Sequence, residues 1–116
     1  MNVVFLTTDL MFSSRVLGAA TTLGLSLKIA PTAAAVVQNI AEQTQLVLVD
    51  LMLAGVELGP LVENIREKSP AAKIVAFGPH VDEALLSSAS LAGCDGVWTR
   101  SQFQQRYVEL LKTCVA

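Results

Sequence analysis

The chain has 116 residues, of which 53% are hydrophobic and 16% charged, and its formal net charge is −2. This length fits a single domain, residues 1–116, whose core is large enough to be stable without disulfide bonds. The slight acidity argues against a nucleic-acid partner, and two cysteines are too few for a disulfide scaffold. Because no stretch of about 20 residues is apolar enough to span a membrane, we expect a cytoplasmic protein with no membrane segment.

The first half of the chain alternates short apolar runs with segments of helical periodicity. Residues 3–6 are apolar and partly β-branched, which predicts a buried strand, and a helical stripe follows over residues 12–23. Apolar and polar residues alternate over 25–30, which predicts a second strand with one face more exposed to solvent. A second helical stripe covers residues 33–41. The continuous apolar run 46–49 predicts a central strand that is covered on both faces.

The second half repeats this alternation. A helical stripe over residues 58–65 precedes a predicted strand at 73–77. A short fifth strand is expected at 96–100, and the last helical stripe runs over 103–114. Between these two strands we expect a weaker helix, whose inward stripe would consist of Ala84, Leu85, Ser88 and Leu91.

Helix-terminating residues support these boundaries. Gly24 and Gly93 are expected to end the helices that precede them, and Pro60 fits the first turn of the third helix. Asp82 and Ser101 are the predicted N-caps of the fourth and fifth helices, because short polar side chains satisfy the first free amides.

Five strands alternating with five helices predict an α/β fold, a flavodoxin-like doubly wound (βα)5 domain with a parallel sheet of order 2-1-3-4-5. In such folds ligands bind beyond the carboxyl ends of the strands, at the point where the strand order reverses. The residues that follow the predicted strands are therefore the candidate functional residues: Thr7, Thr8, Asp9, Asp50, Gly78, Pro79, His80 and Arg100.

Two segments carry a resemblance to a known family. Residues 46–57 read LVLVDLMLAGVE and residues 92–100 read AGCDGVWTR. The first resembles the phosphoacceptor strand and loop, and the second the fifth-strand motif, of the receiver domains of bacterial two-component response regulators. The likeness extends over the whole chain in element order and length. It implies that Asp50 stands at the phosphoacceptor position, that Arg100 replaces the family's lysine, and that a histidine kinase is a candidate partner.

The sequence departs from the family at the metal site. The resemblance implies an acidic pair after the first strand that holds Mg²⁺, and the favoured register places Thr7 and Thr8 there. Hydroxyl groups are poor replacements, because Mg²⁺ prefers hard anionic oxygen ligands. A register shifted by one residue would instead place Asp9 in the pair and restore one carboxylate.

Other positions also depart from the family. Gly78 stands where the family has a hydroxyl residue, and Arg100 cannot reproduce the compact ammonium group of lysine. Ala54 replaces the usual proline of the loop, and Val97 replaces the switch aromatic. Together these changes suggest a pseudo-receiver, which keeps the fold without the phosphorylation chemistry.

Two interpretations of the strand ends follow. In the favoured interpretation, Asp50 forms a salt bridge with Arg100, while the hydroxyls of Thr7 and Thr8 form hydrogen bonds with backbone groups. The chain then needs no cofactor and is an interaction module rather than an enzyme. In the alternative, the chain is a working receiver that is phosphorylated on Asp50, with Mg²⁺ held by Asp9 and Asp50.

An interaction module needs a surface, and two helical segments without charge are candidates. Residues 16–27 and residues 85–94 contain no charged residue. Small uncharged side chains permit close packing against another protein. The expected outward positions are Gly18, Thr21, Thr22, Leu86, Ser87 and Ser90. The resemblance implies a homodimer or a docked protein on the face of the fourth helix, fifth strand and fifth helix, where Trp98 would contribute.

Overall fold

The structure is a computed structural model that describes residues 2–53 and 57–115, so Ala54 of the family motif lies outside the described residues. Its strands form one parallel sheet in the order β2-β1-β3-β4-β5, which confirms the predicted fold class. The strands are β1 (Val3–Leu6), β2 (Leu27–Ala30), β3 (Leu46–Asp50), β4 (Lys73–Gly78) and β5 (Gly96–Thr99). The helices are α1 (Leu10–Thr22), α2 (Ala33–Asn39), α3 (Leu58–Lys68), α4 (Glu83–Leu91) and α5 (Arg100–Lys112).

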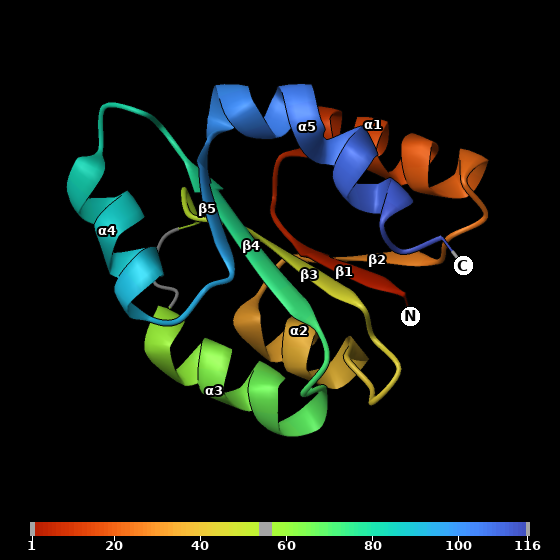
Figure 1. The fold of residues 1–116 in the computed structure, drawn as a ribbon, viewed down its shortest axis with the longest axis horizontal. Coiled ribbons are helices and arrows are strands. Elements are labelled where there is room, and N and C mark those ends of the chain that lie inside the picture. Colours follow the sequence, from red (N-terminus) through yellow and green to blue (C-terminus); the bar gives the residue numbers. More distant parts are fainter. Residues whose placement is uncertain (1, 54–56, 116) are drawn as a thin grey trace.

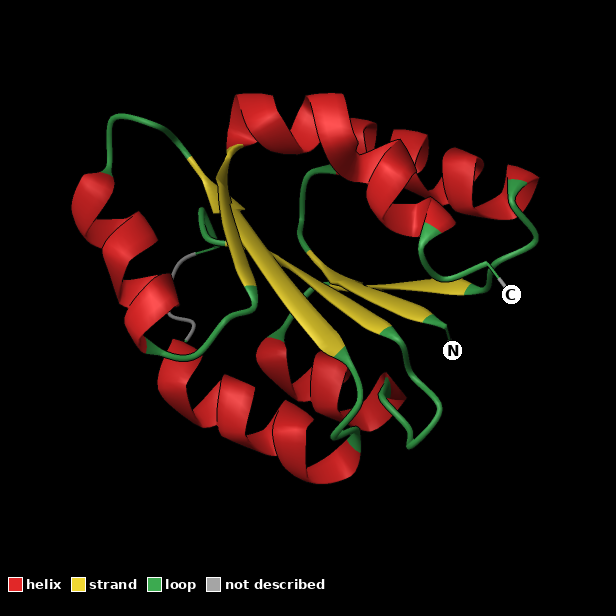
Figure 2. Cartoon of the chain, viewed as in Figure 1, coloured by secondary structure: helices red, strands yellow, loops and turns green. Residues whose placement is uncertain are grey.

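The sheet is the middle of three layers (Figures 1 and 2). Helices α1 and α5 cover one face, α2 and α3 cover the other, and α4 lies beside β5 at one edge. Every residue of β1 and β3 is buried, because both faces of these central strands are covered. This burial explains why residues 3–6 and 46–49 are continuously apolar rather than alternating. Among the described residues, no helix has the length and the apolar character needed to cross a membrane.

The α1–α5 face of the sheet carries an aromatic cluster. Phe77 and Phe103 stack with ring centroids 4.2 Å apart, and Phe12 meets Phe103 edge-on at 5.5 Å. Such pairs each contribute about 0.5–1.5 kcal/mol beyond the burial of their surface. The cluster fixes the beginning of α1 against the beginning of α5, next to the carboxyl ends of β1 and β4.

Strand β2 begins two residues later than predicted. The amide of Leu25 donates to the carbonyl of Ala20, closing the end of α1, and the amide of Ser26 donates to the Asn2 side chain. These two residues are therefore used to end the helix and to turn the chain. The predicted stop at Gly24 is confirmed, since its φ of 76° is a conformation that favours glycine.

The inward face of α4 differs from the predicted stripe. Ala84, Ser88 and Leu91 are exposed, Leu91 by 88%, whereas Ala89 is fully buried. The helix contains only serine, alanine and leucine after Glu83 and no charged residue, so its sequence does not indicate which face is turned to solvent. The small side chain of Ala89 allows the helix to approach the sheet, and this packing decides its rotation.

The predicted helix ends are confirmed except at α5. Asp82 caps α4 through the amide of Leu85 at 3.0 Å, and Gly93 ends α4 with a φ of 99°. The N-cap of α5 is Thr99 rather than Ser101, because β5 leads directly into α5. Thr99 accepts from the amide of Gln102, whose side chain accepts in return from the amide of Thr99.

Candidate functional site

Asp50 is the last residue of β3, and both of its carboxylate oxygens are engaged. Thr7, which directly follows β1, donates its hydroxyl to Asp50 Oδ2 at 2.8 Å. The amide of Met52 donates to Oδ1 at 3.0 Å. Asp50 and Thr7 are 5% and 1% exposed, and a buried carboxylate requires such hydrogen bonds to offset its lost hydration. The predicted backbone role of Thr7 is thus only part of its function, because it also holds Asp50.

A second carboxylate lies beside this pair on the loop that leads into α1. Asp9 caps α1 by accepting from the amide of Phe12 at 3.0 Å, and its own amide donates to the hydroxyl of Thr7 at 3.1 Å. Asp9 Oδ2 accepts from the guanidinium of Arg100, the first residue of α5. The amide of Phe12, followed by Arg100, holds the pKa of Asp9 below its ordinary value against an opposing effect of desolvation.

The predicted salt bridge between Asp50 and Arg100 is wrong. The guanidinium carbon of Arg100 lies 5.3 Å from the ring centre of Phe12 and 5.9 Å from that of Phe77. This position on the aromatic cluster aims Arg100 at the beginning of α1, where Asp9 is one-third exposed. Asp50 is more deeply buried and is already hydrogen-bonded by Thr7 and Met52.

The end of β4 is lined by apolar side chains. A Cβ atom at Gly78 would lie 3.4 Å from Leu51 Cβ and 3.5 Å from Leu86 Cδ2. The space beside Gly78, where a side-chain hydroxyl would begin, is therefore bordered by leucine from the β3–α3 loop and from α4. Of the other candidate residues, Thr8 and His80 are exposed and Pro79 is half-buried.

The carboxylates at this edge that could bind a Mg²⁺ ion are already engaged in hydrogen bonds and an ion pair. Two carboxylates are present, Asp9 and Asp50, but the charge of Asp9 is compensated by Arg100. Mg²⁺ requires near-octahedral coordination by hard oxygens, and it has to displace or share the hydrogen bonds described above. Over residues 2–53 and 57–115, no group of three or more His, Cys, Asp or Glu side chains could hold a metal ion.

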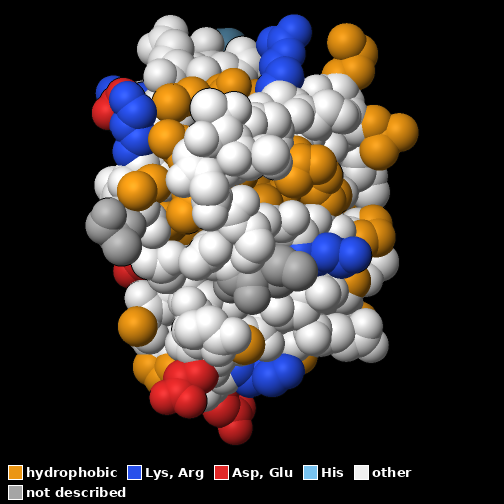
Figure 3. Space-filling view, turned by 90° about the vertical axis from the view of Figure 1, so that its right-hand side faces the viewer, with side chains coloured by type: hydrophobic (Ala, Val, Ile, Leu, Met, Phe, Trp, Pro, Cys, Tyr) orange, Lys and Arg blue, Asp and Glu red, His pale blue; other side chains and the backbone are white. Residues whose placement is uncertain are grey.

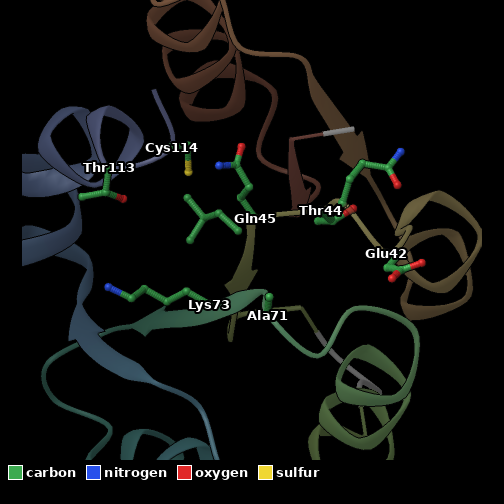
Figure 4. A pocket seen from close by; sticks show the side chains of 9 residues that line it. Glu42, Thr44, Gln45, Ala71, Lys73, Thr113 and Cys114 are labelled. Atoms are coloured by element: carbon green, nitrogen blue, oxygen red, sulfur yellow. The ribbon is translucent and has the colours of Figure 1, made fainter. Parts of the chain in front are cut away.

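A pocket lies at the opposite end of the sheet, beside the amino ends of its strands (Figure 4). It has a volume of about 470 Å³ and opens between the amino ends of β3 and β4 and the end of α5. Lys73, Thr113 and Cys114 lie on one side of it and Glu42 on the other. Burial raises the pKa of the Cys114 thiol, so this side chain is not an activated nucleophile. None of the candidate residues predicted from the strand ends contributes to this pocket.

Sequence reasoning missed the apolar members of the site. Leu51 and Leu86 border Gly78, and the rings of Phe12 and Phe77 hold Arg100. No motif could reveal them, because leucine and phenylalanine at these positions also read as ordinary core residues. The involvement of Thr7 was detectable, since it directly follows the first predicted strand.

Solved structures of similar fold are receiver domains and response regulators. The chain matches the receiver domain of NtrX from Brucella abortus with a TM-score of 0.76 and 18% identity, over 97% of both chains. It matches a response regulator from Thermotoga maritima with a TM-score of 0.72 and 21% identity, over 97% of this chain and 95% of the other.

A third neighbour is the receiver domain of a sensor histidine kinase from Pseudomonas aeruginosa PAO1, with a magnesium ion coordinated in its active site cleft. Its TM-score is 0.69 at 13% identity, over 95% of this chain and 96% of the other. No family model and no curated protein sequence matches the chain. At these identities the comparison establishes the fold, which is that of receiver domains.

Proposed function

We propose that this chain is an atypical receiver-like signalling domain that acts as a phosphorylation-independent protein-interaction module and associates with a second copy of itself. The observation that carries this proposal is the hydrogen bonding of Asp50. Thr7 and the amide of Met52 occupy its two oxygens, while Arg100 is paired with Asp9.

The demands of phosphoryl transfer weigh against Asp50 as an acceptor in this arrangement. Its catalysis rests on positioning and on charges aimed at the transferred group. Here the cation at the end of β5 is held by another carboxylate, and Gly78 offers no hydroxyl. A phosphoryl group on Asp50 would have to displace Thr7 or Met52 and would lie near the leucine side chains beside Gly78.

The surface proposed for association is the face formed by α4, β5 and α5. Leu91 is 88% exposed at the end of α4, and Ser87 and Ser90 are exposed beside it. Trp98 of β5 is half-buried, with the Arg106 guanidinium carbon 5.9 Å from its ring centre. Interface centres are depleted of charge and enriched in tryptophan and arginine, which matches this composition.

The uncharged side of α1 is a second surface of similar character. Gly18, Thr21 and Thr22 are exposed, as predicted from the sequence. Figure 3 shows one side of the molecule, on which charged side chains are confined to a few places. We assign the self-association to the α4–β5–α5 face, because that face combines the exposed Leu91 of α4 with the half-buried Trp98 of β5.

The alternative function is a working receiver that is phosphorylated on Asp50. One observation favours it: Asp50, Asp9 and Arg100 lie at the same edge of the sheet and are connected through Thr7. A histidine kinase would then be the phosphodonor or the partner, and Mg²⁺ would have to displace Arg100 from Asp9.

Multi-angle light scattering over a concentration series tests the proposed function. We expect a dimer that Leu91→Arg weakens, because a charge would be desolvated at the interface. The matched control Leu10→Arg changes a similarly exposed leucine on α1 and should leave the dimer unchanged. Asp50→Asn, and acetyl phosphate with Mg²⁺, should also have no effect. A protein that stays monomeric at high concentration, or that dimerises only with the phosphodonor, would overturn the proposal.

A further inference from the structure

The pocket at the amino ends of β3 and β4 is built on a fixed backbone. One of its walls is the segment that leads into β3. The buried hydroxyl of Thr44 accepts from the amide of Ala41 at 3.0 Å, and the buried hydroxyl of Ser69 donates to the carbonyl of Thr44 at 2.8 Å. On the neighbouring strand, the amide of Lys73 donates to the carbonyl of Gln45 at 3.0 Å. Because these bonds hold both walls in place, the pocket is preformed, as small-molecule sites usually are.

The pocket carries one charge of each sign on opposite walls (Figure 4). Lys73 lies on one side, below Thr113, and Glu42 lies on the other. Neither charged side chain forms a salt bridge with a residue in the described ranges 2–53 and 57–115. A ligand with a single charge would pair with one wall and leave the charge of the other wall without a partner. The two walls together are therefore complementary to a ligand with a positive and a negative end.

The rest of the lining combines carboxamide groups with an apolar floor. Gln45 Oε1 accepts from the Asn2 side chain at 3.0 Å, which leaves its NH₂ group without a partner among the described residues. Gln43 is a second exposed carboxamide at the pocket. A carboxamide both donates and accepts, so it can pair with a peptide bond. The buried lining residues Leu46 and Cys114, 1% and 7% exposed, form a floor that suits a small apolar side chain.

We propose that this pocket binds a short zwitterionic peptide, a dipeptide with both ends free. Lys73 binds its carboxylate, Glu42 binds its ammonium group, and Gln45 pairs with the peptide bond between them. The volume of about 470 Å³ lies within the range of about 300–1,000 Å³ that is typical of small-molecule sites. A free α-amino acid fits less well, because it carries both charges on one carbon atom. The pocket lies at the opposite end of the strands from Asp50, so this proposal is independent of the proposed function.

Titration of the ¹⁵N-labelled protein with alanyl-alanine tests this proposal. We expect saturable shifts at the amides of Gln43, Gln45, Lys73 and Thr113. Two control probes each lack one charge: N-acetyl-alanyl-alanine has no ammonium group, and alanyl-alanine amide has no carboxylate. Each control should bind at least about threefold more weakly, because it leaves one wall of the pocket without its partner. Binding that does not saturate, or shifts confined to other surfaces, would overturn the proposal.

Two variants at the pocket assign each end of the peptide to its wall. Lys73→Gln should bind alanyl-alanine at least about threefold more weakly and should no longer distinguish it from the amide probe. Glu42→Gln should instead lose the preference over the N-acetyl probe and keep the preference over the amide probe.

A matched control separates the site from general attraction. Lys28→Gln makes the same change of net charge as Lys73→Gln, at an exposed position of β2, and should alter the affinity by less than about twofold. Pocket variants that rank the three probes as the wild type does, or equal losses in Lys28→Gln and Lys73→Gln, would contradict the proposal. These readouts depend neither on dimer formation nor on Asp50, so they are distinguishable from failure of the proposed function.

Discussion

Thr7 is the residue on which the described site depends most. It accepts from the amide of Asp9 and donates to Asp50, so a single buried hydroxyl connects the two carboxylate residues. An acidic residue at this position would place a second negative charge next to Asp50 in the protein interior, where like charges raise each other's pKa. A hydroxyl avoids that repulsion and supplies a donor instead.

Replacement of this hydroxyl should therefore destabilise the fold. Thr7→Val keeps the shape of the side chain but leaves Asp50 Oδ2 without its donor, and we expect a loss of about 1–3 kcal/mol in the free energy of unfolding. Urea denaturation monitored by circular dichroism measures this loss. Thr8→Val is the matched control at an exposed position and should change the stability by less than about 0.5 kcal/mol. Equal stability of wild type and Thr7→Val would show that the hydrogen bond does not hold Asp50.

Asp9 should make stability depend on pH in the acidic range. Its pKa is lowered in the folded protein by the amide of Phe12 and by Arg100, so its ionised form is favoured by folding. This contribution is present above the ordinary aspartate pKa of about 3.9 and is lost as the pH falls through the lower folded pKa. Asp9→Asn keeps a good helix cap, so its deficit in stability should shrink as the pH falls through this range.

Carboxyl-detected NMR titration measures the same effect directly. The Asp9 carboxyl should titrate below the ordinary value in the wild type, and Arg100→Gln should move its pKa upward. A pKa of Asp9 that is unaffected by Arg100→Gln would contradict the ion pair between them.

At the level of elements, the strand ends and the helix ends were largely predictable, whereas the rotation of α4 was not. The glycine stops and the Asp82 cap depend on local backbone chemistry, which neighbouring residues reveal. The rotation of α4 depends on which side chain fits the sheet, and a helix whose stripes are almost equally apolar carries no such signal. The N-cap of α5 was misplaced by two residues because β5 and α5 have no loop between them.

Two glycines should respond to alanine with opposite signs. Gly93→Ala should destabilise the protein by about 1 kcal/mol, because φ is 99° there and alanine is strained in that conformation. A new Cβ would not clash, since its nearest neighbour, Val62 Cγ1, lies at 3.7 Å. Gly18→Ala lies inside α1 with open space around it, and it should stabilise the protein by about 0.5–1 kcal/mol. Thermal unfolding of both variants checks this contrast. A stabilising Gly93→Ala would show that the α4–β5 turn is not left-handed in solution.

At the scale of the whole molecule, the sequence specified the architecture better than the contacts of the site. Alternating strand and helix patterns restrict a chain of this length to few topologies, and strand order 2-1-3-4-5 follows from them. The partner of Arg100 depends on where α1 and α5 meet, 91 residues apart in sequence. Periodicity places Arg100 and both aspartates at the same end of the sheet, but it does not decide whether Arg100 pairs with Asp9 or with Asp50. The aromatic cluster positions Arg100 for Asp9.

The central claim is that the receiver fold is used here without phosphorylation of Asp50. ¹⁵N–¹H correlation spectra, recorded with Mg²⁺ alone and with Mg²⁺ and beryllofluoride, test it most directly. We predict no saturable shifts at the amides of Thr7, Asp50 and Met52, in the wild type or in Asp50→Ala. Saturable Mg²⁺-dependent shifts around Asp50 in the wild type that vanish in Asp50→Ala would contradict the account.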